Sequence, residues 1–243
     1  MEKNVKWLFA CIAVAILSLV IYKTVTYPFK QRETISVKGL GETEFESDLI
    51  VWSGKISTDA NTKEEAYRNI GPLTDKVKAY FRRNGIADSL VQYDFINTDE
   101  LTQSVYNNEG NYCGSRRVGY RVSQPFTIQS RDLNKIESVS RGISSLLAQG
   151  ISVDSYSPKY YYTKLDDLKI DLINRASKDA YNRASCIAEN TGASINKAIK
   201  SNLGIFQITS AMGDDDYSYG GTFNTSSRLK KASVTVNVEF SID

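Results

Sequence analysis

The chain has 243 residues, 41% hydrophobic and 24% charged, which is enough to bury the core of one large domain or two small ones. Its 30 basic and 28 acidic residues almost cancel, and no basic stripe interleaves with aromatic residues, so nucleic-acid binding is not expected. The sequence contains no histidine, which excludes triads with an imidazole base and zinc sites with histidine ligands.

An uncharged apolar segment, Trp7–Tyr22, follows the basic residues Lys3 and Lys6. As a helix its 16 residues cover about 24 Å, so flanking lysines must snorkel to cross a hydrocarbon core of about 30 Å. No small-x-small cleavage site follows Val20, which favours an uncleaved signal anchor over a removed signal peptide.

This segment sets the expected order of domains. We expect a cytoplasmic tail and transmembrane anchor over residues 1–22, a tether over 23–33 and a globular domain over 34–243. Basic residues on the two sides of the anchor nearly balance, so charge alone does not orient it.

The globular part opens with two predicted strands, Thr34–Glu46 and Leu49–Ser57, joined at a polar corner. Gly39 and Gly41 in the first of them predict a bulge or the close approach of another backbone. The remaining elements are expected to pack back onto this pair.

Apolar residues that recur every three or four positions predict three helices. The first opens on a capping box, Thr62 and Glu65, and contains Gly71-Pro72, where we expect a kink or a broken first turn. Ser130 is the predicted N-cap of the second, and small alanines in the third favour close packing on a sheet. The predicted bounds are Ala60–Asn84, 130–150 and Leu165–Thr191.

The other predicted strands are Val91–Gln103, 118–128, Ile151–Tyr162, Ala198–Ile208 and 234–240, with loops at Tyr106–Arg116 and Ala211–Ser227. Pro125 predicts an edge strand or a bulge. The order of elements predicts an α+β fold, a two-layer α/β sandwich of antiparallel or mixed sheets with about three helices. Residues 57–162 are compatible with a ferredoxin-like part.

No residue is assigned a catalytic, cofactor-binding or metal-binding role. Asp214–Asp216 lacks the alternating ligands of an EF-hand, which favours a solvated acidic loop, and Arg228–Lys231 is interpreted as a solvated strand entry. Cys113 and Cys186 form a disulfide only in an oxidising compartment; the alternative is two free thiols, with Cys186 buried on a helix.

Two tyrosine-rich segments are the candidate interface residues, because tyrosine is enriched in contact surfaces. The alternative is that these tyrosines are ordinary strand and loop residues. The candidates are Tyr160, Tyr161, Tyr162, Tyr217 and Tyr219.

The segment VKGLGETEFESDLIVW at Val37–Trp52 resembles the opening motif of the SIMPL family of bacterial cell-envelope proteins. Asn84-Gly85-Ile86, Gly119-Tyr120 and Gln149-Gly150-Ile151 follow in the family's order, and the resemblance covers Thr34–Asp243. It implies a two-layer α/β fold that is exported to the periplasm or held at the inner membrane. Some members form large oligomers and some are linked to oxidative-stress defence. No catalytic residues are established for the family, so none are carried over.

With the resemblance, we expect a single-pass inner-membrane protein anchored through residues 7–22, with its C-terminal domain in the periplasm. The first functional hypothesis is a non-enzymatic, homo-oligomeric protein that self-assembles or scaffolds partners. The second is a module that binds a small envelope ligand in a pocket with convergent polar groups. A histidine-free hydrolase is the third, although no spacing singles out a nucleophile and its base.

Overall fold

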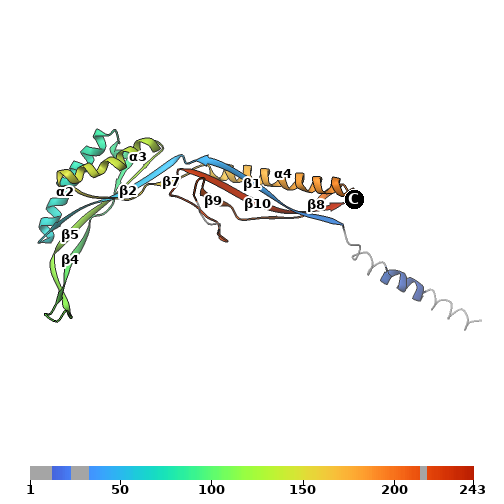
Figure 1. The fold of residues 1–243 in the computed structure, drawn as a ribbon, viewed down its shortest axis with the longest axis horizontal. Helices are drawn as coiled ribbons and strands as arrows, with labels where there is room; N and C mark the ends of the chain where they lie inside the picture. Colours follow the sequence, from blue (N-terminus) through green and yellow to red (C-terminus); the bar gives the residue numbers. More distant parts are fainter. Residues whose placement is uncertain (1–12, 23–32, 214–217) are drawn as a thin grey trace, which may run out of the picture. The chain divides into compact units, whose positions relative to one another are not determined.

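The computed structural model describes residues 13–22, 33–213 and 218–243 (Figure 1). Contacts divide the chain into two compact units. Unit 1 comprises residues 1–41, 173–204 and 234–243, and unit 2 comprises residues 42–172 and 205–233. The elements are β1 Thr34–Glu46, β2 Leu49–Ala60, α2 Lys63–Arg83, η1 Asp88–Leu90, β3 Val91–Tyr93, β4 Asn97–Tyr106, β5 Tyr112–Ser130, α3 Leu133–Gly142, η2 Ile143–Gln149, β6 Ser152–Ser155, β7 Lys159–Tyr161, α4 Leu165–Thr191, β8 Ile195–Leu203, β9 Gln207–Ser210 and β10 Leu229–Ile242.

Unit 2 is built on a six-stranded sheet in the order β3-β5-β2-β6, with β4 also paired to β5 and β7 to β2. All of these pairs are antiparallel. Helix α2 connects β2 to β3, and α3 connects β5 to β6, so each helix joins two strands that have another strand between them. This is the strand order of a split β-α-β arrangement, and it begins at Leu49.

The core of unit 2 lies between this sheet and the two helices. Alternate residues of β2 and β5 point inward, and Trp52, Phe81 and Phe126 meet edge-to-face with ring centroids 5.2–5.8 Å apart. All three are essentially inaccessible to solvent. Each buried side chain of this size contributes roughly 2–3 kcal/mol, so this aromatic cluster fixes the helices on one face of the sheet.

The second sheet has the order β1-β10-β8, with β9 also paired to β10, and most of β1, β10 and α4 belongs to unit 1. A Cβ atom at Gly39 would lie 2.1 Å from the carbonyl oxygen of Ala176 and 2.7 Å from the Cβ of Ala180. The close approach predicted for Gly39 is therefore confirmed. The matching small face of α4 is completely buried and consists of Ala176, Ala180, Ala184 and Ala188.

The fold is α+β with antiparallel sheets, as predicted. Helix α4 has the predicted bounds, and the Thr62 side chain accepts the Glu65 N–H at 3.2 Å, as expected of the N-cap of α2. Helix α2 continues through Pro72 from Lys63 to Arg83. The bounds 34–243 of the globular domain, with one or two subdomains, and the ferredoxin-like part at 57–162 stay predictions.

Several predicted elements differ from the structure. Strands predicted as single pieces are split into β3 and β4, β6 and β7, and β8 and β9. The helix predicted over 130–150 is α3 followed by η2, and its N-cap is Asp132, whose side chain accepts the Lys135 N–H at 3.1 Å. Ser130 instead accepts the Asp132 N–H. Asp132 is the N-cap because it directly precedes the first helical residue.

The predicted edge position of Pro125 is wrong, because β5 lies between β2 on one side and β3 and β4 on the other. The Pro125 carbonyl accepts the Asp94 N–H at 3.0 Å, in the break between β3 and β4. The N and C=O of a strand residue point to the same side, so the missing N–H faces this break. A central strand tolerates the proline there because no ladder bond is lost.

The predicted membrane anchor lies partly outside the described residues. Residues 13–22 are helical, with exposed apolar side chains. Within the ranges that the structure describes, no helix is both long and apolar enough to cross a membrane.

Candidate interaction surface

The strands β4 and β5 form a hairpin that continues past the end of the sheet (Figure 1). Strand β2 follows β5 only as far as the pair Ala60 and Tyr120. Beyond that pair, residues 102–118 are paired only within the hairpin, from Thr102 opposite Arg117 to Tyr106 opposite Tyr112. We call residues 102–118 the arm.

The tip of the arm is closed by local hydrogen bonds. The Asn107 side-chain oxygen accepts the N–H groups of Glu109 and Asn111 at 3.0 and 2.8 Å, and the Asn107 N–H donates to the Asn111 carbonyl at 2.9 Å. Gly110 has a φ of 82°, a conformation that a residue with a Cβ rarely adopts. The sequence Asn-Asn-Glu-Gly-Asn therefore specifies the turn.

The arm exposes apolar and aromatic side chains along both of its strands. The exposed fractions are 41% for Val105, 60% for Tyr106, 61% for Tyr112 and 45% for Val118. The rings of Tyr106 and Tyr112 contact each other across the hairpin, with centroids 5.9 Å apart. A two-stranded ribbon of this kind is marginally stable alone, and its outer edges present unpaired N–H and C=O groups.

The base of the arm is held firmly. Arg121 donates two hydrogen bonds of 2.8 Å to the Asp59 carboxylate, and these bonds lower the pKa of Asp59. Lys63 and Arg117 both lie 5.2 Å from the centroid of the Tyr120 ring. The arm therefore leaves the sheet from a fixed base.

The predicted interface tyrosines lie elsewhere in unit 2. Tyr160 donates to Glu137 at 3.0 Å, and burial raises the pKa of this phenol, aided by that hydrogen bond. Tyr162 packs on Phe45 with ring centroids 4.7 Å apart, and Tyr161 pairs with Leu49 in the β2–β7 ladder. These three side chains are half-buried within their own unit.

The loop tyrosines and the cysteines are placed differently. Tyr219 is fully exposed, whereas Tyr217 lies outside the described residues. Cys113, on the arm, and Cys186, on α4, are both free and exposed, so Cys186 is not buried as one alternative expected.

The predicted solvated strand entry at Arg228–Lys231 needs a correction. Lys230 is 1% exposed, and its Nζ donates to the carbonyls of Asn224 and Ser227 at 2.7 and 2.6 Å. Arg228 donates to Glu46 and Asn134, both at 2.6 Å. Lys230 is buried against carbonyls of the loop before β10, whereas β1 and α3 supply the acceptors of Arg228. Local sequence does not reveal these contacts.

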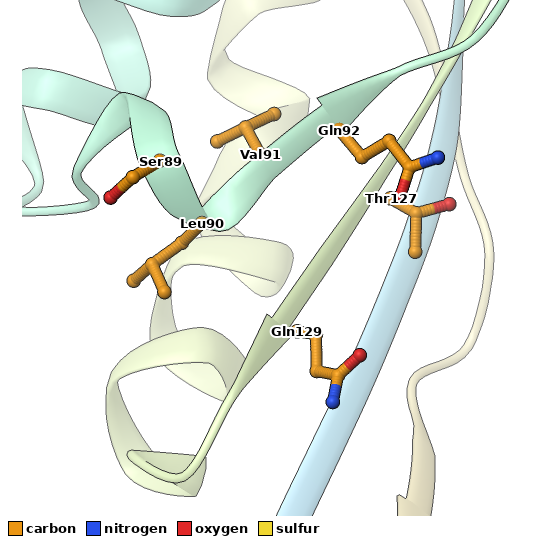
Figure 2. A pocket seen from close by; sticks show the side chains of 6 residues that line it. All are labelled: Ser89, Leu90, Val91, Gln92, Thr127 and Gln129. Carbon is orange, nitrogen blue, oxygen red and sulfur yellow. The ribbon is translucent and has the colours of Figure 1, made fainter.

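A shallow cavity of about 360 Å³ lies at the β3 edge of unit 2 (Figure 2). Its lining residues are Ser89, Leu90, Val91, Gln92, Thr127 and Gln129. Hydroxyl and amide groups can position a ligand there by hydrogen bonds, but the lining holds no acid, base or thiol. No group of three acidic or cysteine side chains in the described parts of the chain is placed to hold a metal ion.

Sequence reasoning missed the arm as a surface. It divided the hairpin between a strand ending at Gln103 and a loop over Tyr106–Arg116. Alternation of apolar and polar residues marks strands that have one buried face. The arm has no buried face, so this alternation is weak in its sequence. The sequence signal that could have revealed the arm is its turn sequence, which is flanked by Val105-Tyr106 and Tyr112.

A known protein family matches most of this chain. The SIMPL model, described as a protein of unknown function (DUF541), matches residues 35–240. No curated protein sequence matches the chain. The crystal structure of a hydrolase from Listeria innocua aligns over 91% of this chain and 98% of its own, with 9% identity and a TM-score of 0.17, too low to establish a shared fold. The family match covers most of the chain and bears out the resemblance in the sequence, so this protein belongs to the SIMPL family.

Proposed function

We propose that this chain is a non-enzymatic envelope protein, anchored through residues 7–22 with its folded part in the periplasm, that self-assembles or scaffolds partners. The apolar N-terminal segment supports the anchor, and the SIMPL membership supports the location. The link of some family members to oxidative-stress defence supports a role in stress.

The observation that carries the proposal is the arm. Four of its apolar or aromatic side chains are more than 40% exposed, and its strand edges beyond Tyr120 lie outside the sheet. Covering such a ribbon with another protein surface buries these side chains and satisfies the strand edges. Tyr106 and Tyr112 are suited to this role because tyrosine contributes a large contact area at low entropic cost.

The first test is the solution mass of the Lys30–Asp243 fragment, measured by light scattering over a concentration series. We expect a discrete oligomer. The double variant Tyr106→Ser/Tyr112→Ser should shift the mass toward the monomer while circular dichroism stays unchanged. Tyr67→Ser is the matched control, because Tyr67 is 55% exposed on α2 of the same unit. A parent fragment that stays monomeric at high concentration argues against assembly.

The native thiols give a second test. Cys113 lies on the arm and Cys186 on α4, and both are exposed. In a fragment carrying Cys186→Ser, mild oxidation should join Cys113 of two copies if the arms meet each other. The reciprocal Cys113→Ser fragment controls for random collision of thiols. Equal dimer yields from the two variants would count against an arm-to-arm contact.

The side of the membrane on which the folded part lies is tested with Cys113. A thiol reagent that does not cross membranes should label Cys113 of the full chain in intact spheroplasts of a bacterial host, because the folded part then faces outward. Labelling that occurs only after the membrane is broken would place the folded part in the cytoplasm.

A second candidate function, binding of a small envelope ligand, is favoured by the cavity lined with amides and hydroxyls. A ligand that binds only the folded state raises the melting temperature, and this supplies a general screen.

A further inference from the structure

The sheet of unit 2 has a second face, turned away from α2 and α3. Successive strand residues point to opposite faces. Trp52, Phe126 and Ile128 enter the core beneath the helices, so their neighbours Ser53 and Thr127 belong to the opposite face. Both of these are half-buried polar residues.

Uncharged polar side chains line up across three strands on that face. Gln92 of β3 is in register with Thr127 of β5, which is in register with Ser53 of β2. Neighbouring strands lie about 4.8 Å apart, so these groups form a row at that spacing. Gln129 adds a second amide two residues further along β5, and Figure 2 shows Gln92 and Thr127 next to each other with Gln129 beyond them.

The end of this row coincides with the 360 Å³ cavity, which also has an apolar side. Leu90 lines it and is 41% exposed, and Val91 lies beside it. The cavity therefore offers an apolar surface next to two exposed amides and a hydroxyl. This combination suits a ligand that has both C–H faces and many hydroxyl groups.

Three acidic groups near the row are already paired with basic groups. Asp88, next to Ser89, accepts two hydrogen bonds from Arg82 Nε. On the same face as the row, Lys55 pairs with Asp154 at 3.4 Å and Arg121 with Asp59 at 2.8 Å. An anionic or cationic ligand would find no unpaired counter-charge among these groups, whereas a neutral ligand loses nothing by their pairing.

We propose that this face binds an uncharged, polyhydroxylated chain, a glycan, laid across β3, β5 and β2. The Gln92 and Gln129 amides donate to and accept from sugar hydroxyls, Thr127 and Ser53 extend the row, and Leu90 contacts a ring face. Binding is weak, with a dissociation constant of about 0.1–1 mM, because the site is open and few hydrogen bonds offset the loss of ligand freedom.

The test uses the full chain in mild detergent, titrated with chitotetraose, an uncharged tetramer of N-acetylglucosamine, and followed by saturation-transfer NMR and calorimetry. We expect the parent chain to bind, and the affinity to fall about tenfold in the double variant Gln92→Ala/Gln129→Ala. Both amides are exposed, so their removal leaves the core intact. Gln103→Ala, an exposed amide on the arm, is the matched control and should bind like the parent.

Three results would overturn the proposal. One is the absence of binding at about ten times the expected dissociation constant. Another is equal affinity in the parent and the double variant. The third is tighter binding of tri-galacturonate, an acidic trisaccharide, which would mean that charge governs recognition. The oligomer mass is measured in parallel, so that a failure of assembly and a failure of glycan binding are told apart.

Discussion

Tyr93 shows how one buried hydroxyl makes stability depend on pH. Its oxygen has no hydrogen-bond partner among the described residues, and burial raises the pKa of the phenol to about 12 from the ordinary 10.0. Below pH 10 the folded and unfolded states both hold the proton. Between pH 10 and about 12 the unfolded chain releases its proton first, so the free energy of unfolding falls across this window.

Tyr93→Phe should therefore flatten the loss of stability between pH 10 and 12, measured by urea unfolding at several pH values. Tyr80 and Tyr160, whose pKa values are also raised, keep part of the slope. Near pH 7 the variant should be neutral or more stable by up to about 1 kcal/mol, because an unsatisfied buried hydroxyl is removed. Tyr67→Phe controls for the loss of an exposed phenol; a marked destabilisation by Tyr93→Phe would contradict the account.

Gly39 is fixed by its contact with α4. A side chain there meets the Ala176 carbonyl oxygen and the Ala180 nitrogen at 2.1 and 2.5 Å, so the backbone must move. Gly39→Ala should lower the free energy of unfolding by about 3 kcal/mol or more. Gly220→Ala is the matched control, since a Cβ there meets nothing within 4 Å beyond its chain neighbours, so the free energy of unfolding should change by about 0.5 kcal/mol or less. Denaturation followed by circular dichroism measures both.

At the scale of elements, Lys230 joins β10 to the loop before it. Lys230→Met keeps the aliphatic stem but leaves the Asn224 and Ser227 carbonyls without this donor, at a cost of about 1–3 kcal/mol. Hydrogen exchange should accelerate at the Asn224 amide, which donates to Ile208 at 2.8 Å. Lys231→Met, which breaks a partly exposed pair with Glu42, should cost about 1 kcal/mol or less. Equal losses of stability in the two variants would contradict the conclusion that Lys230 joins β10 to the loop.

At the scale of the whole molecule, the chemistry of the arm predicts how assembly responds to salt. The exposed large apolar side chains of the arm are tyrosine and valine, and the ion pair between Arg117 of the arm and Glu100 is long, at 3.8 Å. Salt screens exposed charges but not apolar contacts or strand pairing. The mass of the Lys30–Asp243 fragment should therefore be the same in about 0.1 and 1 M salt. Dissociation at the higher salt concentration would indicate that charged surfaces form the interface.

Much of the fold followed from local signals. Local sequence predicted the strands β1 and β2, the full length of α4 and the N-cap at Thr62, because caps and apolar periodicity act within a few residues. Of the candidate site, the sequence placed Tyr160 and Tyr161 in a strand and Tyr219 in a loop, as the structure has them. It did not reveal that Tyr160 and Tyr162 are engaged within their own unit.

The sequence by itself determined the α+β class, the family and the small face of α4, since each depends on residue order or on spacing along one element. Only the tertiary structure decided which strands neighbour β5, and hence why Pro125 is tolerated in a central strand. It also decided that Lys230 is buried and that the arm extends past the sheet. Those features depend on partners far away in the chain, because burial and strand pairing are properties of neighbours in space.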